Sequence, residues 1–437
     1  MIIVGAGITG LALAHEIQRR VPNAAVTILE ASGRAGGLIG TTLADGYLLE
    51  WGPEAMQGSS TETLDLLSDL RLREKIVEAA PEARTRYVVH RGVVTPLPLD
   101  PRGALGTRLL SPAAKLRAAM EVLVGPGNGE ESVAQFGRRR FGPAVVPLLD
   151  AVVTGLFAGD PEELSLDVAL PQLRWLENSH GSVIKGMMKR RGAGSLSTPL
   201  LTLEGGMETL VRALADGTDI RFRTRVGRVQ KGNGQVLAIT DDGSEAADVV
   251  VLAGGPSMAR LVDGPRISTP KVREAPVAVV GLGFGASVAD ERSQGYGFLS
   301  PEGEGRFVLG VLYTSSLFPA HAPEGRILYR CLLGGIRHPD RARLSDDELI
   351  KGCQGDLRSL LGVAGEAEFT HVVRHGRGIP QLELGHRSVI SALGELEKAV
   401  PGLYIEGTGC SGISTNHLIG KARALAKRIV ADRLGPG

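Results

Sequence analysis

The chain has 437 residues, which is long enough for two or three domains with separate hydrophobic cores. Hydrophobic residues make up 43% of it and charged residues 22%, a globular composition that excludes a largely disordered chain. The formal net charge of +1 gives no electrostatic reason to expect a nucleic acid partner.

Three further features bear on location and on metals. No run of about 18 apolar residues occurs, so we expect no membrane-spanning helix. The first predicted strand begins at residue 2, so we expect no presequence and a cytoplasmic location. The cysteines, Cys331, Cys353 and Cys410, are scattered without a CxxC pair, so we expect neither a disulfide framework nor a metal site.

The first 30 residues carry the strongest motif. Residues 2–4 form an apolar run typical of a buried strand, residues 5–10 read GAGITG, and residues 11–17 have helical spacing. This order predicts a dinucleotide site, because the glycines let the backbone approach a pyrophosphate at the helix N-terminus. A second strand over 25–29 ends in Glu30, whose carboxylate can hold a ribose hydroxyl.

Residues 60–190 are predicted to form a helix over 60–80, a hairpin over 84–98 and then several further helices. Two basic clusters, Arg138–Arg140 and Lys185–Arg191, lie next to apolar helices. We interpret them as solvated helix faces, with docking to an anionic membrane surface as the alternative. The further helices are expected over 112–120, 132–142, 145–155 and 168–176.

Residues 201–254 are predicted to return to the cofactor domain. They contain a turn into a helix, two strands over 219–222 and 225–229, and a buried strand over 247–253. The cofactor domain is therefore predicted to be discontinuous along the chain.

The last third of the chain is predicted to be mostly β-structure. Residues 279–285 have GxGxG spacing without a following helix, and we interpret them as a strand and not as a second nucleotide loop. Residues 295–335 predict an antiparallel sheet with an apolar pocket wall. Residues 402–409 predict a strand that leads into a closing helix over 416–434.

Two segments after the fingerprint resemble one flavoprotein superfamily. Glu30–Gly37 reads EASGRAGG and is similar to the E-x3-R-x-G-G extension of the FAD-dependent amine oxidase and protoporphyrinogen oxidase superfamily. Gly46–Pro53 resembles the next segment of the same families. The alternative, an NAD-binding unit with an ordinary glycine-rich loop, does not explain this pairing. The resemblance implies FAD as the cofactor.

The rest of the chain is similar to oxygen-dependent protoporphyrinogen oxidases. Residues 155–160 match the family's G-x-[FY]-A-G-[DN] stretch, and motifs at 295–301, 315–319, 322–326, 379–381 and 385–386 follow in the family's order. The resemblance implies an α/β fold with a discontinuous Rossmann-like FAD-binding domain of the amine oxidase type, a mixed-sheet substrate domain and a helical subdomain. The implied boundaries are 1–80, 201–265 and 386–437 for FAD binding, 81–100 and 266–385 for the substrate domain, and 101–200 for the helical subdomain, a candidate for membrane association.

The resemblance also implies site residues. Arg86 would pair with a substrate propionate. The macrocycle pocket would be lined by Gly155, Tyr296, Leu299, Leu309 and Leu332. FAD would be held by Gly5, Ala6, Gly7, Ile8, Thr9, Gly10, Glu30, Ala31, Arg34, Gly37, Leu38, Gly52, Pro53, Glu54, Ala55, Val226, Thr408, Ile413, Ser414 and Thr415.

Two positions depart from the family pattern. Asn416-His417 stands where an Asn-Asp or Pro-Asp pair is usual, and Leu382 stands where Ile-Pro-Gln is commonly followed by tyrosine. The first departure touches a flavin-side loop and the second touches the sheet that leads to it. Neither removes a residue with known chemistry, so the implied class is unchanged.

The implied activity is the oxidation of protoporphyrinogen IX to protoporphyrin IX in heme biosynthesis, in three two-electron rounds that each pass a hydride to flavin N5. Without a second nucleotide loop, we expect oxygen or a quinone to reoxidise the flavin, and oxygen would form hydrogen peroxide. Because FAD carries the chemistry, we assign no catalytic acid or base and interpret His375 and His386 as structural.

Three alternatives stay open. A coproporphyrinogen III oxidase would share these motifs and would bind four propionates instead of two. An amine oxidase would need an aromatic pair around the amine, and only 4% of the residues are aromatic. A flavin- or porphyrin-binding chaperone would consume no oxygen. A homodimer and a peripheral contact with the inner face of the cell membrane are also open.

Overall fold

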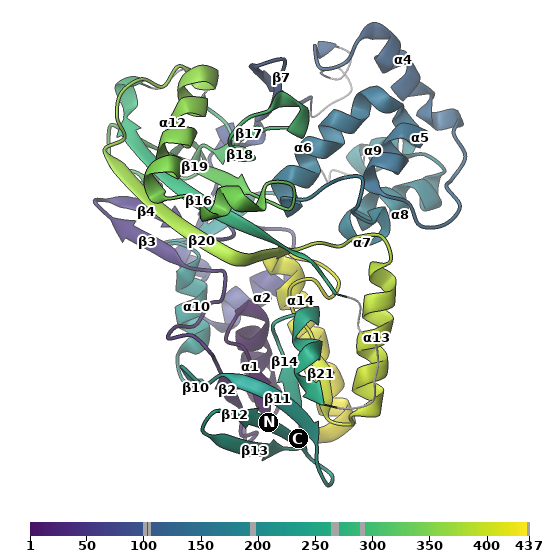
Figure 1. The fold of residues 1–437 in the computed structure, drawn as a ribbon, viewed down its shortest axis with the longest axis vertical. Coiled ribbons are helices and arrows are strands. Elements are labelled where there is room, and N and C mark those ends of the chain that lie inside the picture. Colours follow the sequence, from purple (N-terminus) through teal and green to yellow (C-terminus); the bar gives the residue numbers. More distant parts are fainter. Residues whose placement is uncertain (99–102, 104–105, 193–197, 264–270, 289–292, 435–437) are drawn as a thin grey trace.

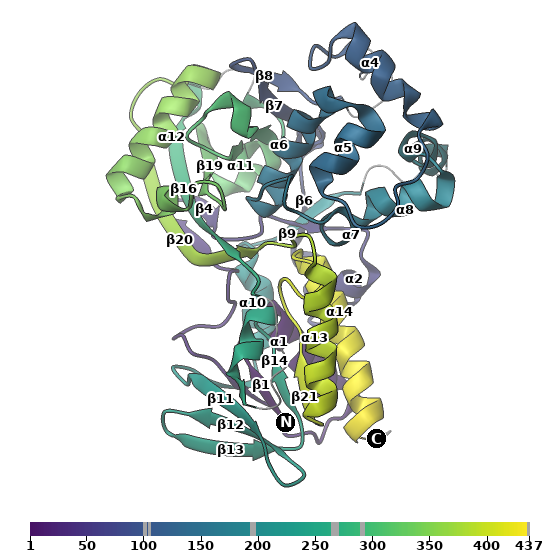
Figure 2. The ribbon, with the colours of Figure 1, turned by 45° about the vertical axis from the view of Figure 1, so that its right-hand side comes forward.

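The computed structural model describes residues 1–98, 103, 106–192, 198–263, 271–288 and 293–434. A five-stranded parallel sheet with its helices forms the lower half in Figure 1, and we call it the cofactor unit. A seven-stranded sheet lies above it, with a group of helices beside that sheet, which we call the helical unit (Figures 1 and 2).

The sheet of the cofactor unit is assembled from distant parts of the chain. Ile3 in the first strand pairs with Ile28 on one side and with Val251 on the other, all in parallel. This confirms the discontinuous Rossmann-like arrangement. The strand order is β10 (Asp219–Arg221), β2 (Thr27–Leu29), β1 (Ile2–Val4), β14 (Val250–Leu252) and β21 (Leu403–Ile405).

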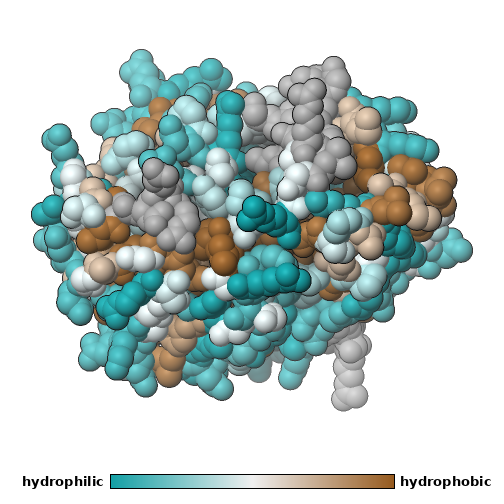
Figure 3. Space-filling view, turned by 90° about the horizontal axis from the view of Figure 1, so that it is seen from above, coloured by the Kyte–Doolittle hydropathy of each residue, from teal (hydrophilic) through white to brown (hydrophobic). Residues whose placement is uncertain are grey.

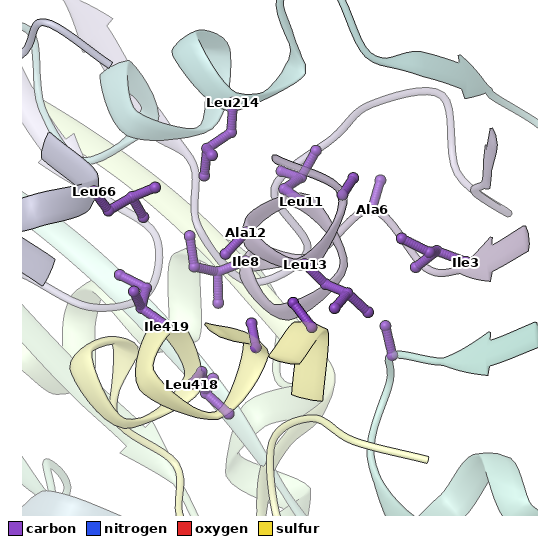
Figure 4. Close-up of a cluster of buried hydrophobic side chains, with 14 of the residues drawn as sticks. Ile3, Ala6, Ile8, Leu11, Ala12, Leu13, Leu66, Leu214, Leu418 and Ile419 are labelled. Atoms are coloured by element: carbon purple, nitrogen blue, oxygen red, sulfur yellow. The ribbon is translucent and has the colours of Figure 1, made fainter. Parts of the chain in front are cut away.

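Helices from both ends of the chain cover this sheet. Figure 4 shows Ile8 of α1 pointing toward Ile419 of α14, in a cluster that is almost entirely buried and that also contains Leu11 and Leu418. Burial of each such side chain stabilises the fold by about 1.5–3 kcal/mol. The helices of the unit are α1 (Ile8–Arg20), α2 (Thr61–Asp69), α10 (Glu208–Ala215), α13 (His386–Ala399) and α14 (Thr415–Ile429).

Three small sheets flank the cofactor unit. The predicted helix over 60–80 was too long: it ends at Asp69, Arg71 has a positive φ of 57°, and residues 76–78 join one of these sheets. The sheets contain β3 (Thr41–Ala44) and β4 (Tyr47–Glu50); β5 (Met56–Gln57), β9 (Leu200–Leu203) and β6 (Ile76–Glu78); and β13 (Gly243–Ala247), β12 (Val236–Thr240), β11 (Val226–Lys231) and β15 (Val262–Asp263).

The seven-stranded sheet contains the predicted hairpin, whose first strand runs parallel to β17; the other neighbouring pairs are antiparallel. The GxGxG segment 279–285 lies inside β16, so its interpretation as a strand is confirmed. The strand order is β20 (Phe369–Pro380), β16 (Glu274–Gly285), β19 (Arg326–Gly334), β18 (Gly310–Leu312), β17 (Gly297–Leu299), β7 (Arg86–His90) and β8 (Val93–Pro96).

The two faces of this sheet differ. One face buries Phe298, Val311 and Cys331 against α12 (Asp346–Leu361). Residues directly opposite each other in a sheet share a face, and alternate residues of a strand do so too. The opposite face, which we call the inner face, therefore carries Arg86, Val88, Gly297, Leu299, Gly310, Leu312, Arg330 and Leu332.

The helical unit lies beside β7. The predicted helix over 168–176 is interrupted at Leu170, where Pro171 starts a new helix. The helices of the unit are α4 (Pro112–Ala119), α5 (Val133–Phe141), α6 (Val146–Phe157), α7 (Leu166–Ala169), α8 (Pro171–His180) and α9 (Val183–Gly192). The short helix α11 (Thr314–Leu317) lies outside this unit and follows β18. No helix among the residues described is long and apolar enough to cross a bilayer.

The first basic cluster is not a solvated face, so that interpretation was wrong, and so was its membrane-docking alternative. Arg140 is fully buried, with Nε 2.9 Å from a carboxylate oxygen of Glu177. Arg139 is 2.5 Å from Glu131 and largely covered. Of the three arginines, Arg138 alone is well exposed, paired with Glu162. The helix turns successive residues by about 100°, so three adjacent arginines meet different surroundings.

Candidate functional site

The glycine-rich turn follows β1 at the edge of the five-stranded sheet where its parallel strands end. A β-carbon on Gly10 would lie 2.1 Å from the carbonyl oxygen of Gly5, so only glycine fits there. A β-carbon on Gly7 would meet nothing within 4 Å. Gly7 precedes α1, whose first-turn N–H groups donate no hydrogen bond to a capping side chain. This cradle fits the pyrophosphate of a dinucleotide.

Glu30 joins two loops at this edge. Its carboxylate accepts hydrogen bonds from the backbone N–H of Ala6 and of Ser32, both at 2.8 Å. The Gly36 N–H donates to the Ala6 carbonyl at 2.7 Å. A carboxylate has about four acceptor positions, so Glu30 can still accept a ribose hydroxyl. Ala31, the next residue, is exposed.

Arg34 organises the second glycine loop. Its guanidinium donates to the carbonyls of Gly37 at 2.5 Å and Ile39 at 2.8 Å, and it lies 4.5 Å from the centre of the Trp51 ring. Leu38 contacts the next predicted segment, because a β-carbon on Gly52 would lie 2.4 Å from the Leu38 carbonyl oxygen. The loop around Gly37 and the segment that begins at Gly52 are thus adjacent.

The C-terminal part of the site precedes α14. Ser414 caps this helix by accepting the His417 N–H at 3.3 Å. The unusual pair Asn416-His417 makes one distant and one local contact: Asn416 donates to the carbonyl of Gln57, far away in the sequence, at 2.9 Å, and the His417 ring lies 2.9 Å from the Ser411 hydroxyl. Thr408, Ile413 and Thr415 belong to the same loop and helix start, whereas Val226 is buried at the start of β11.

The predicted pocket residues come together at the inner face. Leu299 lies opposite Gly155 of α6, because a β-carbon on Gly155 would lie 2.4 Å from a Leu299 methyl group. The Leu309 N–H donates to the Leu332 carbonyl at 2.8 Å. Leu299 and Leu332 flank Gly310 in adjacent strands.

Arg86 stands at the exposed end of this surface. Its guanidinium lies 4.9 Å from the centre of the Tyr296 ring and makes no hydrogen bond or ion pair with any residue described. Burial raises the pKa of Tyr296, so its phenol stays neutral at ordinary pH. A free cation beside an apolar face fits a ligand with carboxylates at one edge.

Sequence reasoning named Glu54 as a cofactor residue but did not find Arg330, with which Glu54 forms a buried pair at the other end of the inner face. Arg330 and Glu54 are 3% and 6% exposed, and their closest charged atoms are 3.3 Å apart. His321 lies nearby, and burial lowers its pKa to about 4. The missed signal was the charged Arg330 inside the otherwise apolar segment 327–334.

Two histidines near the family motifs make backbone contacts. The ring of His375 lies 2.9 Å from the Trp51 carbonyl oxygen, and the ring of His386 lies 2.8 Å from the Gly409 carbonyl oxygen. Burial lowers the pKa of both. Leu382 is buried in the core of the helical unit. All three cysteines are free and buried, and the described part of the chain holds no group of residues suited to a metal.

An acidic cavity of about 530 Å³ lies between α6 and β7. Asp150, Asp160, Glu162, Glu302 and Glu304 line it, and its Arg337 is 2.7 Å from Asp150. Its negative lining repels carboxylates, so it does not fit a propionate-bearing ligand.

Glu50 makes the stability of the protein pH-dependent. Burial, and then the negative charge of Glu54, raise the pKa of Glu50 to about 8. Between its unfolded and folded pKa values the folded chain keeps a proton that the unfolded chain has lost. Stability therefore falls as the pH rises through this window, by at most about 1.4 kcal/mol per pH unit.

We expect the Glu50→Gln variant to lack this loss, since glutamine mimics the protonated carboxyl toward Met207 N–H and the Thr41 hydroxyl. Urea unfolding at pH 6, 7 and 8 tests it: the variant should gain stability over the parent protein as the pH rises. If the difference in free energy of unfolding between the variant and the parent protein does not change with pH, the raised pKa of Glu50 is contradicted.

The fold and the glycine cradle agree with a comparison to known families. Residues 8–415 match the family described as flavin-containing amine oxidoreductase. The chain belongs to this family. It is an FAD-dependent oxidoreductase, and its likeness to porphyrinogen oxidases is confirmed by the relatives that follow.

Curated relatives of this flavoprotein span nearly its whole length. It is 30% identical to coproporphyrinogen III oxidase of Bacillus subtilis (strain 168), over 97% of this chain and 96% of that one. It is 28% identical to protoporphyrinogen oxidase 2, chloroplastic/mitochondrial, of Arabidopsis thaliana, over 98% and 93%. A crystal structure from Exiguobacterium sp. 255-15, provisionally assigned as a protoporphyrinogen oxidase, has a TM-score of 0.86 at 25% identity over 98% of each chain.

Proposed function

We propose that this flavoprotein oxidises protoporphyrinogen IX to protoporphyrin IX, with molecular oxygen as the final acceptor and hydrogen peroxide as by-product. The observation that carries the proposal is the apolar inner face with the free guanidinium of Arg86 at one end and the Gly52 segment at the other. The names of the relatives support the substrate class.

Residues of the chain bind and orient the substrate in this proposal. Arg86 would hold propionates, while Leu299, Leu309 and Leu332 would contact the macrocycle and exclude water from it. FAD, when bound, supplies the acceptor for the two electrons of each round. Its holders would be the predicted residues at the strand ends, in the two glycine loops, in the Gly52 segment and before α14.

Coproporphyrinogen III is the second candidate substrate, because the bacterial relatives carry that name. Charge favours the dicarboxylate. Of the two arginines on the inner face, Arg330 is paired with Glu54, so Arg86 is the one whose charge is available for propionates. Four propionates distributed around a ring would leave more carboxylates without a cation.

An anaerobic assay tests the function. Each porphyrinogen is added separately to the FAD-loaded protein, bleaching of the flavin band is followed, and porphyrin fluorescence is followed after air is admitted. We expect faster bleaching and turnover with protoporphyrinogen IX. Preference for the tetracarboxylate would assign the second candidate, and no bleaching with either would contradict the proposal.

In the same assay, Arg86→Met should lower kcat/KM about three- to thirtyfold, mainly through KM, because an exposed charge-assisted bond contributes to binding. Arg84→Met, two residues earlier and also exposed, is the matched control and should stay within about twofold of the parent protein. An equal loss in both variants would show a general charge effect and not a propionate site.

A peripheral membrane contact stays a proposal. The helical unit exposes Trp175, Met187 and Met188, with exposed Lys189 beside them. Figure 3 shows apolar atoms gathered at its right-hand end, over this unit. Apolar side chains next to lysines fit a negatively charged lipid surface. We therefore keep a cytoplasmic location with contact at the inner face of the membrane as part of the proposal.

A further inference from the structure

Glu54 lies in an unusual position between the cofactor unit and the inner face. It follows Gly52 by two residues, and Arg330 reaches both: Nη2 donates to the Gly52 carbonyl at 2.5 Å, and Nη1 is 3.3 Å from Oε2 of Glu54. Arg330 itself belongs to β19 and thus to the inner face. Glu54 is therefore held at the junction of the cofactor segment and the surface assigned to the substrate.

Most of the hydrogen-bonding capacity of this carboxylate is open. Burial raises the pKa of Glu54, whereas the charge of Arg330 and the adjacent Thr314 hydroxyl lower it, but neither Glu54 oxygen completes a hydrogen bond of normal geometry in the described part of the chain. The nearest histidine nitrogen, Nδ1 of His321, is 3.8 Å away, and burial lowers the pKa of that ring to about 4, so it carries no charge at neutral pH. Buried acceptors are normally satisfied, and these oxygens offer about four positions to a donor.

Glu50 provides the comparison, because it is buried in the same segment and is satisfied. One of its oxygens accepts the Met207 N–H at 2.7 Å and the other accepts the Thr41 hydroxyl at 2.8 Å. Burial and a buried neighbouring carboxylate are therefore compatible with full hydrogen bonding in this region. The open acceptors of Glu54 belong to a small buried group around it, in which Nδ1 of His321 and Nε of Arg330 also lack a completed hydrogen bond among the residues described.

A row of residues on the inner face leads from Arg86 to Arg330, which pairs with Glu54. Arg86, Gly297, Leu312 and Arg330 lie side by side in four adjacent strands. Three strand spacings separate the two arginines, roughly 14 Å. Tyr296 lies near this row: its ring centre is 4.9 Å from the Arg86 guanidinium, and after burial, which raises its pKa, the charges of Arg86, Glu54 and Arg330 also affect that pKa. A flat ligand whose acidic edge is at Arg86 would extend along this row toward Glu54.

We propose that the Glu54 carboxylate, oriented by Arg330, accepts hydrogen bonds from the pyrrole N–H groups of the reduced macrocycle; this rests on the proposed function. A porphyrinogen has four such donors, and its saturated bridges let several of them converge on one anion. A porphyrin is flat, keeps two N–H groups and presents two acceptor nitrogens. Glu54 therefore favours the substrate over the oxidised product, and it belongs to the substrate site instead of the FAD set.

The test is a binding measurement that involves no turnover. The FAD-loaded protein is reduced, freed of excess reductant and kept under nitrogen, so that it cannot accept electrons. Protoporphyrinogen IX and protoporphyrin IX are then titrated separately and their Kd values are taken from quenching of tryptophan fluorescence. We expect the parent protein to prefer protoporphyrinogen IX, and Glu54→Gln to weaken this ligand about ten- to hundredfold while protoporphyrin IX changes less than about threefold.

Two further variants keep the test informative if Glu54→Gln does not fold. Glu54→Gln leaves the buried Arg330 without its counter-charge and can fail to fold. Glu54→Asp keeps the charge, withdraws the oxygens by one bond, and should show the same selective loss at smaller size. Glu50→Gln is the matched control and should leave the ratio of the two Kd values unchanged.

Each other outcome overturns the inference. An equal loss of affinity for both ligands would mean that Glu54 only shapes the site. Loss of FAD from the Glu54 variants without a change in the ratio of the Kd values would mean that Glu54 binds FAD and not the substrate. An unchanged ratio in both Glu54 variants would exclude the contact. If the parent protein binds neither tetrapyrrole and its flavin is not bleached, the proposed function itself fails. That result differs from one in which the parent protein binds both ligands and the Glu54 variants leave the ratio of the Kd values unchanged.

Discussion

Replacing Gly10 by alanine is expected to destabilise the protein and to abolish retention of FAD. The added β-carbon would lie 2.1 Å from the Gly5 carbonyl oxygen and 3.2 Å from a methyl group of Ile3. A backbone oxygen cannot rotate away as a side chain does, so β1 and α1 must separate. We expect a cost of about 1–3 kcal/mol or more, and more than a hundredfold weaker FAD binding, because the pyrophosphate cradle is lost.

Gly7→Ala separates the two effects. A β-carbon on Gly7 meets nothing within 4 Å, and its φ of −73° suits alanine. The apoprotein should therefore unfold at the parent's temperature, while FAD binding weakens if the phosphates pass close to this backbone. Thermal unfolding of the apoproteins and the flavin absorbance of the purified proteins measure both effects. Full FAD retention in Gly7→Ala would contradict the placement of the pyrophosphate.

Arg140→Met is expected to destabilise the helical unit by about 3–5 kcal/mol. Arg140 is fully buried, pairs with Glu121 and Glu177, and donates to the carbonyls of Val124 and Gly181. Methionine has a similar length but leaves the buried carboxylate of Glu121 without its counter-charge and these backbone acceptors without a donor. Glu177 keeps its pairs with Arg139 and Arg174. Hydrogen exchange over α5 and α6 measures the loss directly, since exchange reports the free energy of local opening at each backbone amide.

Arg138→Met is the matched control for this prediction. It lies two positions earlier in the same helix, and its partner Glu162 is 50% exposed. A solvent-exposed pair contributes about 0–1 kcal/mol, so this variant should exchange almost like the parent protein. Equal protection in the two variants would mean that the buried network adds no stability.

The parts predicted correctly from the sequence are those that neighbouring residues determine. The strand, glycine turn and helix over residues 2–17 follow from local spacing, and so does the hairpin around Arg91-Gly92. The inner face does not follow from local spacing, because it depends on the parallel pairing of Arg86 with Gly297, two residues far apart in the chain. The family resemblance named residues of this face, but spacing could not place Arg330 beside Glu54.

The misinterpretation of Arg138–Arg140 has the same physical origin. Three adjacent cations indicate a solvated face only if no carboxylates reach them. Here Glu121, Glu131 and Glu177 arrive from three separate segments of the helical unit. Charge counted along the chain cannot show such pairing, whereas the fold determines it.

The way the five-stranded sheet is assembled has a consequence for the order of events in the cell. Its last strand, β21, lies near the carboxyl end of the chain and pairs with β14. Helix α14, which packs against α1, follows β21 in the sequence. A ribosome that has made the first 390 or so residues has produced the glycine turn but not the strand and helix that complete its surroundings. We therefore expect flavin to be taken up after translation has ended, and early termination to leave an unfilled, protease-sensitive chain.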